Sequence, residues 1–488
     1  MNVLQVSAEI FPLLKTGGLA DIAGALPAAL RAAGAGPRLL LPGFPAILAD
    51  LKSSEPVADV ATPWGDVVQL RRGHLAALDT TAYVIDAPAL YDRPGNPYED
   101  AQRQPYADNH RRFALLGLVA ARLALGLDAA WQPQVLHCHD WHAALAPAYL
   151  RFLAPAGAAS ATPKVASIYT VHNLAYQGLF SAHHFGDLGL PEAAFAVDGL
   201  EFHGQISFMK AGLYFADRIT TVSPTYAREI QTREQGCGLD GLLRVRAPAL
   251  SGILNAVDDA VWNPATDALI PFAYDARKPA GKGRCKIALQ QELGLTVRND
   301  APLFGVVSRL TEQKGLHLVL SGLDQLMARG GQLVLLGSGE GWMEDAFRAR
   351  AAANPDNLAV RIGYDESFAH RIFAASDVTL VPSRFEPCGL TQMYGLKYGS
   401  LPLVRRVGGL ADTVVDCTLE DLVEGHATGF VFDEFSERGF EQALRRAFAL
   451  YARRTEWNAV RARGMRQDLG WQTAAARYLD LYRSALAG

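Results

Sequence analysis

The sequence predicts an α/β protein made of two doubly wound domains that face each other across a deep cleft. Its 488 residues are too many for one ordinary hydrophobic core and suit two domains of roughly 200–250 residues. Short, nearly all-apolar runs of strand length alternate with longer helical stretches, a pattern typical of parallel sheets covered by helices on both faces. A segment rich in Pro, Asp and Asn, residues 252–283, interrupts this alternation and is expected to be irregular linkage.

The predicted elements follow from these runs. In the first half we expect strands at Val3–Ser7, Arg38–Leu41, Tyr83–Asp86, Val135–His139, Ile168–Val171 and Ile219–Val222. In the second half we expect strands at Leu303–Ser308, Gln332–Leu336, Leu358–Ile362, Val378–Val381 and Leu401–Val404. Helices are expected at Leu316–Arg329, Trp342–Ala353, Phe368–Ala375 and Leu390–Tyr398. We place the domain boundary near Ile253, which gives domains at 1–252 and 253–470 and a C-terminal segment at 471–488.

Composition excludes several classes of protein. The net charge is −4 with both signs interspersed, which argues against a nucleic-acid binder with a basic face. Five scattered cysteines without a CxxC pair argue against a disulfide framework or a structural zinc site. No export signal is visible at the N-terminus, and no apolar run reaches the roughly 18 residues that would span a membrane. We therefore expect a cytoplasmic protein that binds neither nucleic acid nor membrane.

The pentapeptide Gly-Gly-Leu-Ala-Asp occurs twice, at Gly17–Asp21 and at Gly408–Asp412. Lys15 lies just before the first copy, and a pair of arginines lies just before the second. Paired glycines beside a cation, at the start of a predicted helix, suit a backbone that wraps around an anionic group. The first helix is expected to start around Asp21 and to kink at Pro27. The repeat predicts two surfaces that close on one ligand; the alternative is coincidence in a chain rich in Gly, Ala and Leu.

Histidines gather after two predicted strands. His137, His139 and His142 lie together with Asp140, and His172 follows the next strand along the chain. Three histidines and a carboxylate suggest a metal site. However, His137 and His139 share one strand face while the other two lie in the following turn, so convergence on one ion is not expected. We favour polar contacts to a hydroxylated substrate.

The second half carries the strongest signal. Arg309 and Lys314 come directly after one buried strand, and Glu386 comes just before a helix that Gly389 opens. The two cations and the helix-terminal amides suit the charge that builds on a departing diphosphate, with Glu386 facing a sugar. A surface ion-pair pattern is the alternative. No Asp-x-Asp pair ends a strand, so we expect a mechanism that uses no metal.

Taken in order, these segments resemble the bacterial glycogen synthase and plant starch synthase family, retaining glucosyltransferases of the two-domain GT-B fold. The resemblance covers essentially the whole chain and rests on Lys15–Leu19, Tyr91–Tyr98, His139–His142, Thr170–Gly178, Ile253–Asn255, Ser308–Gly315, Glu386–Gln392 and Arg405–Thr413. It implies two Rossmann-like domains and a C-terminal helix from Trp471 that packs back on the first domain. Lys397 and Val407 depart slightly from the family pattern.

The resemblance also implies roles for individual residues. Catalytic groups around the sugar and the leaving diphosphate would be Glu386, Arg309, Lys314, His172 and Asp140. Donor-binding groups would be Lys15, Gly17, Gly18, Asn255, Tyr364, Cys388, Gly389, Leu390 and Thr391. Among these, Asn255 would touch the glucose and the ring of Tyr364 would pack on the nucleotide base.

The implied reaction transfers glucose from ADP-glucose to the non-reducing 4-hydroxyl of an α-1,4-glucan such as glycogen, with anomeric retention and no cofactor. The route stays open between a front-face path and a covalent path through Glu386. The alternatives are a GT-B enzyme that uses UDP-glucose or another acceptor, a non-catalytic glucan-binding protein, and an NAD-linked oxidoreductase. The last lacks GxGxxG after the first strand.

Overall fold

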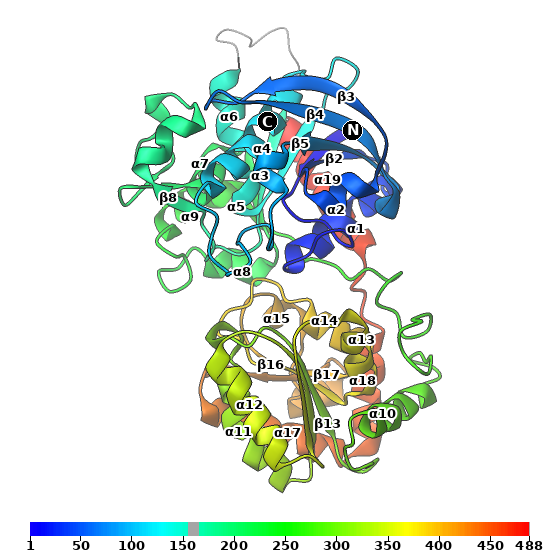
Figure 1. The fold of residues 1–488 in the computed structure, drawn as a ribbon. Coiled ribbons are helices and arrows are strands. Elements are labelled where there is room, and N and C mark those ends of the chain that lie inside the picture. Colours follow the sequence, from blue (N-terminus) through cyan, green and yellow to red (C-terminus); the bar gives the residue numbers. More distant parts are fainter. Residues whose placement is uncertain (155–164, 488) are drawn as a thin grey trace. The chain divides into compact units, whose positions relative to one another are not determined.

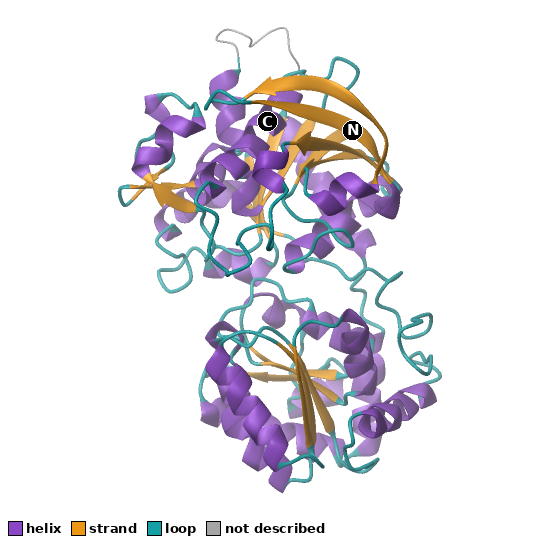
Figure 2. Ribbon diagram, in the orientation of Figure 1, coloured by secondary structure: helices purple, strands orange, loops and turns teal. Residues whose placement is uncertain are grey.

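The computed structural model describes residues 1–154 and 165–487, and these divide into two compact units (Figure 1). Unit 1 comprises Met1–Asn255 together with the C-terminal helix, and unit 2 comprises Ala256–Gly470. Each unit is built on one large twisted sheet with helices packed against it (Figure 2). The chain leaves unit 1 just after the expected boundary near Ile253 and returns to it at Trp471.

The main sheet of unit 1 has the order β12-β11-β7-β6-β1-β2-β5-β4-β3. Its parallel strands are β1 (Asn2–Val6), β2 (Gly36–Pro42), β5 (Thr80–Asp86), β6 (Val135–His139), β7 (Ala166–Val171), β11 (Arg218–Thr221) and β12 (Leu250–Gly252). All six strands predicted for this half are confirmed. The strand order reverses between β1 and β6, and the carboxyl edge of a doubly wound sheet binds ligands at such a reversal.

An antiparallel hairpin at the edge of this sheet was not predicted. It consists of β3 (Leu51–Ala61) and β4 (Val67–Leu75), and β4 pairs antiparallel with β5. Because β3 lies at the sheet edge and many of its residues face solvent, it lacks the continuous apolar run that marks the central strands. A small sheet of β8 (Leu179–Ser181), β9 (Glu201–Phe202) and β10 (Gln205–Ser207) was missed as well.

Helices surround the sheet of unit 1. They include α1 (Gly18–Ala32), α4 (Asn109–Ala124), α5 (Asp140–Ala143), α6 (Ala146–Leu153), α7 (Phe208–Phe215) and α19 (Trp471–Ala487). The first helix begins at Gly18, earlier than the expected start near Asp21, and continues through Pro27. The C-terminal helix α19 packs against α1 and β7, where Tyr478 and Tyr482 join a buried apolar cluster with Val3.

Unit 2 contains a six-stranded parallel sheet with the order β15-β14-β13-β16-β17-β18. The strands are β13 (Leu303–Val307), β14 (Gln332–Gly337), β15 (Leu358–Ile362), β16 (Val378–Val381), β17 (Leu401–Arg405) and β18 (Phe430–Phe432). The five predicted strands are confirmed, and β18 is an addition. The order reverses between β13 and β16, which is the Rossmann arrangement.

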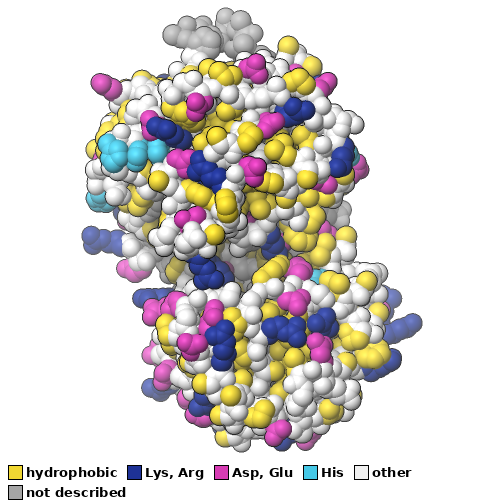
Figure 3. All heavy atoms as spheres, in the orientation of Figure 1, with side chains coloured by type: hydrophobic (Ala, Val, Ile, Leu, Met, Phe, Trp, Pro, Cys, Tyr) yellow, Lys and Arg dark blue, Asp and Glu magenta, His cyan; other side chains and the backbone are white. Residues whose placement is uncertain are grey.

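The helices of unit 2 include the four that the sequence predicts. They are α10 (Ala280–Glu292), α11 (Leu316–Ala328), α12 (Gly341–Ala353), α13 (Glu366–Ala375), α14 (Thr391–Lys397), α15 (Gly408–Thr413), α16 (Leu419–Glu424), α17 (Glu437–Tyr451) and α18 (Arg454–Met465). On the surface drawn in Figure 3, Lys and Arg side chains are interspersed with Asp and Glu in each unit. Within the part of the chain that the structure describes, no helix has both the length and the apolarity needed to cross a bilayer.

Candidate active site

The predicted site residues gather at the carboxyl edges of the two sheets. In unit 1 they follow β1, β6 and β7, which are neighbours in the sheet. In unit 2 they follow β13, β15 and β16. Both groups therefore lie where doubly wound sheets bind ligands, beside the reversal of strand order.

The first glycine turn is held by internal contacts. The Lys15 ammonium pairs with the Asp21 carboxylate, with 2.9 Å between Nζ and Oδ1. The backbone N–H of Gly17 donates to Oε2 of Glu9 at 3.2 Å, and that of Thr16 donates to the same oxygen at 2.6 Å. The Gly17 amide that we predicted to hold phosphate therefore contacts a carboxylate in this structure.

Glu9 is a residue of this site for which we predicted no role from the sequence. Its side chain is buried, and its carboxylate also accepts hydrogen bonds from the hydroxyls of Thr16 and Tyr98. Burial, reinforced by the charge of Glu9, raises the pKa of the Tyr98 hydroxyl well above its usual value. Glu9 thus links the glycine turn to the Tyr91–Tyr98 segment. The signal in the sequence was an acidic residue directly after a buried strand.

Asp140 is buried and His172 half-buried at the ends of β6 and β7. Burial raises the pKa of Asp140 to about 8 and lowers the pKa of His172 to about 3. Nε2 of His172 lies 3.0 Å from Nδ1 of His139. At neutral pH the carboxyl is therefore largely protonated and the imidazole neutral, so both act as hydrogen-bonding groups rather than charges.

Among the histidines at the end of β6, His137 is not available to a metal ion. Both ring nitrogens of His137 are engaged, one with the Thr170 hydroxyl at 2.7 Å and the other with the Tyr482 hydroxyl at 2.8 Å. Elsewhere in the described ranges, His110, His184 and Asp187 have metal-ligand spacing. The rings of His110 and His184 are stacked with centroids 3.9 Å apart, and Nε2 of His110 lies 2.8 Å from Oδ2 of Asp187.

In unit 2 the structure joins two of the predicted catalytic residues directly. Nζ of Lys314 lies 2.5 Å from Oε2 of Glu386, and the Ser383 hydroxyl donates to the same oxygen at 2.9 Å. Lys314 ends the short helix that follows β13, and Glu386 follows β16, the neighbouring strand. Glu386 is only 6 % exposed, so the Lys314 ammonium and the Ser383 hydroxyl take the place of water around Oε2 of its carboxyl group.

The other predicted residues of unit 2 occupy the same sheet edge. Arg309 follows β13 and is exposed. Gly389 has a φ of 71°, and a Cβ there would overlap the side-chain oxygen of Gln392. Buried Cys388 precedes it, and Leu390 and Thr391 begin α14. Tyr364 follows β15, its side chain is 68 % exposed, and its hydroxyl contacts Glu366.

Asn255 is the last residue of unit 1 before the chain crosses to unit 2. Its Oδ1 is buried and finds no hydrogen-bond partner among the residues described. Buried polar atoms are nearly always paired, so this oxygen is suited to accept from a ligand.

The second copy of the pentapeptide supports the backbone that carries Glu386. The N–H of Gly409 donates to the carbonyl oxygens of Glu386 at 3.2 Å and Pro387 at 3.1 Å. A Cβ on Gly408 would overlap the Glu386 carbonyl, and one on Gly409 would overlap that of Cys388. The two glycines thus allow a close approach between protein segments. In this structure they pack on protein backbone, whereas the repeat led us to expect that they wrap an anion.

The two departures from the family pattern have local explanations. Lys397 forms an ion pair with Asp259, which lies in the irregular segment before α10. Val407 is buried, and it caps α15 in extended conformation.

Comparison with known proteins identifies the family. Residues 2–245 match the family described as the starch synthase catalytic domain, and residues 294–460 match glycosyl transferases group 1. A glycogen synthase of Variovorax paradoxus is 67 % identical over 100 % of this chain and 99 % of its own. One of Francisella tularensis subsp. novicida is 54 % identical over 99 % of each chain.

Solved structures agree. The catalytic domain of starch synthase IV from Arabidopsis thaliana, bound to ADP and acarbose, has a TM-score of 0.89 and 31 % identity, covering 100 % of this chain and 99 % of that one. The sucrose-phosphate synthase of Thermosynechococcus elongatus has a TM-score of 0.56 at 17 % identity, which shows similarity of fold alone. The chain has the GT-B fold, and it belongs to the glycogen synthase and starch synthase family of glycosyltransferases.

Proposed function

We propose that this chain transfers glucose from ADP-glucose to the non-reducing 4-hydroxyl of an α-1,4-glucan, with retention of anomeric configuration. The observation that carries the proposal is the Lys314–Glu386 pair at the strand reversal of unit 2, in a chain 67 % identical over its full length to a glycogen synthase. The structural neighbour that was solved with ADP and acarbose supports an adenine nucleotide as the donor. UDP-glucose as donor, or a different acceptor, is the alternative.

The cations of the site would bind the diphosphate. Arg309 and Lys314 follow β13, and the backbone of Gly389–Thr391 follows β16, so positive charge and N–H groups meet at one sheet edge. These groups would stabilise the negative charge that develops as the diphosphate leaves. Lys15 would add a cation from unit 1 by exchanging Asp21 for a phosphate oxygen.

The glucose and acceptor would be held by uncharged hydrogen-bonding groups. Asp140 is protonated at neutral pH, and one of its oxygens, Oδ1, has no partner in the described part of the chain. His172 is neutral, and Asn255 presents a buried acceptor. Sugar hydroxyls both donate and accept, so these groups suit a hexose better than an anion.

We favour the front-face route over a covalent one. The carboxylate of Glu386 is already shared between Lys314 and Ser383, which weakens it as a nucleophile. In the front-face route the bond from C1 to the phosphate oxygen breaks as the bond to the acceptor oxygen forms on the same face. The acceptor proton passes to the leaving phosphate, and Glu386 stabilises the positive charge on the ring.

The proposal includes no metal, because Arg309, Lys314 and backbone dipoles are available to meet the charge of the leaving group.

The proposal also assigns the enzyme to the cytoplasm. Burial raises the pKa of the thiols of Cys138 and Cys417, the latter to about 12, which suits thiols that stay reduced and unreactive.

One assay tests the proposal. The purified chain is incubated with glycogen and either ADP-glucose or UDP-glucose, with and without EDTA, and nucleotide release and the linkage of the product are measured. We expect ADP release well above UDP release, new α-1,4 linkages and no effect of EDTA. Turnover with neither donor would refute the synthase assignment, and faster turnover with UDP-glucose would support the alternative. Inhibition by EDTA that added Mg²⁺ reverses would refute the metal-free mechanism.

A further inference from the structure

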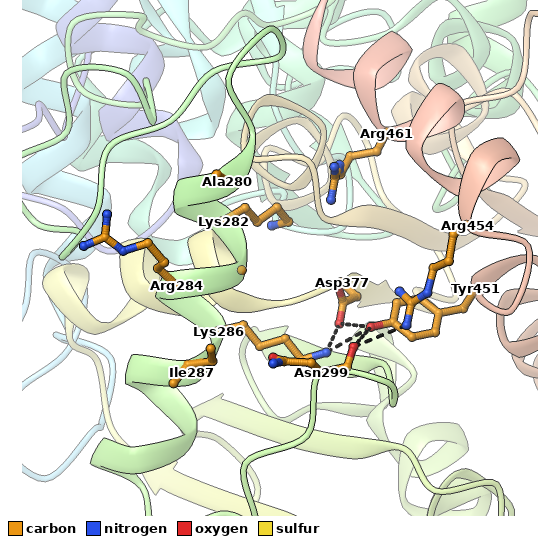
Figure 4. Close-up of a pocket in the computed structure, with 11 residues that line it drawn as sticks. Ala280, Lys282, Arg284, Lys286, Ile287, Asn299, Asp377, Tyr451, Arg454 and Arg461 are labelled. Carbon is orange, nitrogen blue, oxygen red and sulfur yellow. Dashed lines mark hydrogen bonds and ion pairs between the residues drawn. The ribbon is translucent and has the colours of Figure 1, made fainter.

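Unit 2 has a cavity at the edge of its sheet opposite to the one that carries Glu386. The cavity has a volume of about 300 Å³ and lies between α10 and α18 (Figure 4). Asp377, one of its lining residues, directly precedes β16 and accepts a hydrogen bond from the N–H of Leu303, the first residue of β13. The cavity is therefore at the amino edge of the sheet, whereas Glu386 follows the carboxyl end of β16.

The lining of this cavity is strongly basic. It includes Lys282, Lys286, Arg454 and Arg461, and Asp377 is its only carboxylate. Nζ of Lys286 lies 2.7 Å from Oδ2 of Asp377, so these two charges offset each other. The remaining cations face the cavity without a carboxylate from its described lining.

The two lysines have no hydrogen-bonding capacity to spare. The Lys282 ammonium donates to the carbonyl oxygens of Phe373, Ala374 and Tyr398. The Lys286 ammonium donates to Asp377, to the Ala301 carbonyl and to the Tyr451 hydroxyl. Lys286 contributes positive potential to the cavity from a fixed position, whereas burial lowers the pKa of Lys282 to about 7 and leaves it only partly charged at neutral pH. Neither lysine offers an open donor.

The two arginines do have donors to offer. Arg461 is half-buried, and no hydrogen bond or ion pair joins its guanidinium to the residues that the structure describes. Arg454 stacks on the ring of Tyr451 at 3.8 Å and makes only long bonds of 3.3 Å to the carbonyls of Asn299 and Asp300. Both lie on α18, seven residues apart and so on one helix face, and both extend toward the cavity (Figure 4).

Burial of the Arg461 guanidinium disfavours its charged form and lowers the pKa of Arg461. An anion in the cavity would offset this effect of burial. The planar fork of arginine matches the oxygens of a phosphate group, and the first turn of α10, which also lines the cavity, adds a favourable dipole. A volume near 300 Å³ is at the small end of ligand sites and fits a compact molecule.

We propose that this cavity binds a small phosphate-bearing anion, with Arg461 as its principal ligand and Arg454 as the second. The ligand class is a phosphate dianion, either free or carried by a sugar. The site is separate from the donor-binding edge of the same sheet.

Isothermal titration calorimetry of the full chain tests this proposal. The protein is saturated with ADP, so that the donor site is occupied, and is titrated at constant ionic strength with inorganic phosphate, a hexose monophosphate or the neutral hexose. We expect one anion per chain and no binding of the neutral hexose. Equal affinity for both anions would identify free phosphate as the ligand, and tighter binding of the ester would identify a phosphorylated sugar.

Variants assign the binding to the cavity. Arg461→Gln should weaken binding of the anion at least tenfold. Arg454→Gln should weaken it several-fold, and because Arg454 is exposed the fold should tolerate this change. Arg466→Gln is the matched control, because Arg466 caps the same helix, is exposed and lies outside the cavity lining. We expect the affinity of the Arg466→Gln variant for the anion to stay within twofold of that of the parent protein. Turnover without the anion should be unchanged in all three variants.

Two results would overturn the proposal: no binding of either anion, or an equal loss of affinity in Arg466→Gln, which would indicate a general charge effect. Because the calorimetry reads binding alone, a failure of the proposed glucosyltransfer would leave this test intact.

Discussion

Glu386 presents one carboxylate oxygen to both Lys314 and Ser383, and this arrangement predicts how substitutions behave. Glu386→Gln keeps the shape of the side chain but removes the charge that would stabilise the sugar in the transition state. We expect kcat to fall by about 10²–10³-fold, with the Kd for ADP changed less than about threefold. Initial rates and calorimetry measure the two effects separately. Ser383→Ala, which removes one hydrogen bond and keeps the carboxylate, should cost far less. A near-normal rate in Glu386→Gln would exclude a catalytic role.

The buried titratable groups of unit 1 predict an unusual pH dependence of stability. Burial lowers the pKa of His137 and of His172 to about 3, so between pH 3 and about 6.5 the unfolded chain binds more protons at these sites. Unit 1 should therefore gain stability as pH rises through this window. Asp140 acts in the opposite direction, because its pKa of about 8 lets the folded state keep a proton that the unfolded state loses near pH 4.

Above about pH 7.5, one unit past the ordinary histidine pKa, the unfolded chain has released these histidine protons, and Asp140 should then lower the unfolding free energy as pH rises. The limiting slope for this one group is about 1.4 kcal/mol per pH unit. Calorimetric unfolding of the unit 1 transition at pH 5, 6.5, 7.5 and 8.5 measures it. Asp140→Asn should abolish the decline between pH 7.5 and 8.5, and an equal decline in that variant would show that another group is responsible.

At the scale of elements, the two identical pentapeptides begin two helices with different surroundings. Gly17 has a φ of −158°, an ordinary extended conformation, and a Cβ added there would meet nothing within 4 Å. At Gly408 φ is 45°, and Gly408 and Gly409 both pack against the backbone of Glu386–Cys388. The repeated sequence thus gives one open turn and one that braces the backbone of Glu386.

This contrast predicts different results for the same substitution. Gly409→Ala should push the Cys388 carbonyl away, which displaces Glu386 and lowers stability by about 1–3 kcal/mol. We expect kcat to fall more than about tenfold, which would be read from initial rates, and the melting temperature to fall. Gly17→Ala is the matched control and should leave the melting temperature within about 1 °C. Equal destabilisation by both substitutions would mean that the second turn is not a brace.

The elements that the sequence predicts well are those whose signal is local. The central parallel strands, such as β13 and β14, are buried almost throughout and so carry nearly unbroken apolar runs. The β3–β4 hairpin lies at the sheet edge with polar residues exposed, and its pairing depends on partners that no short window contains.

The same division holds for the site. The order of chemical groups after the strands located Arg309, Lys314 and Glu386 at one sheet edge, because parallel strands end together. Contacts between distant segments were not predictable from this order of groups along the sequence. Glu9 accepting the Gly17 amide, and Gly409 supporting Glu386, arise from tertiary packing and leave only a lone acid and a glycine pair in the sequence.

At the scale of the whole molecule, the chain ends by completing the unit in which it began. The helix α19 covers Val3, Leu26 and Ile168 with Tyr478 and Tyr482, and the Tyr482 hydroxyl bonds to His137. Deleting residues 471–488 should expose this cluster and leave a buried histidine without its partner, at a cost of several kcal/mol confined to unit 1. Hydrogen exchange should show lost protection in β1, β6 and β7, with the sheet of unit 2 unchanged. The milder Tyr482→Phe, which keeps the apolar ring and removes only the hydroxyl bond, should cost about 1 kcal/mol. Retained protection of β6 in the deletion would show that unit 1 is complete without α19.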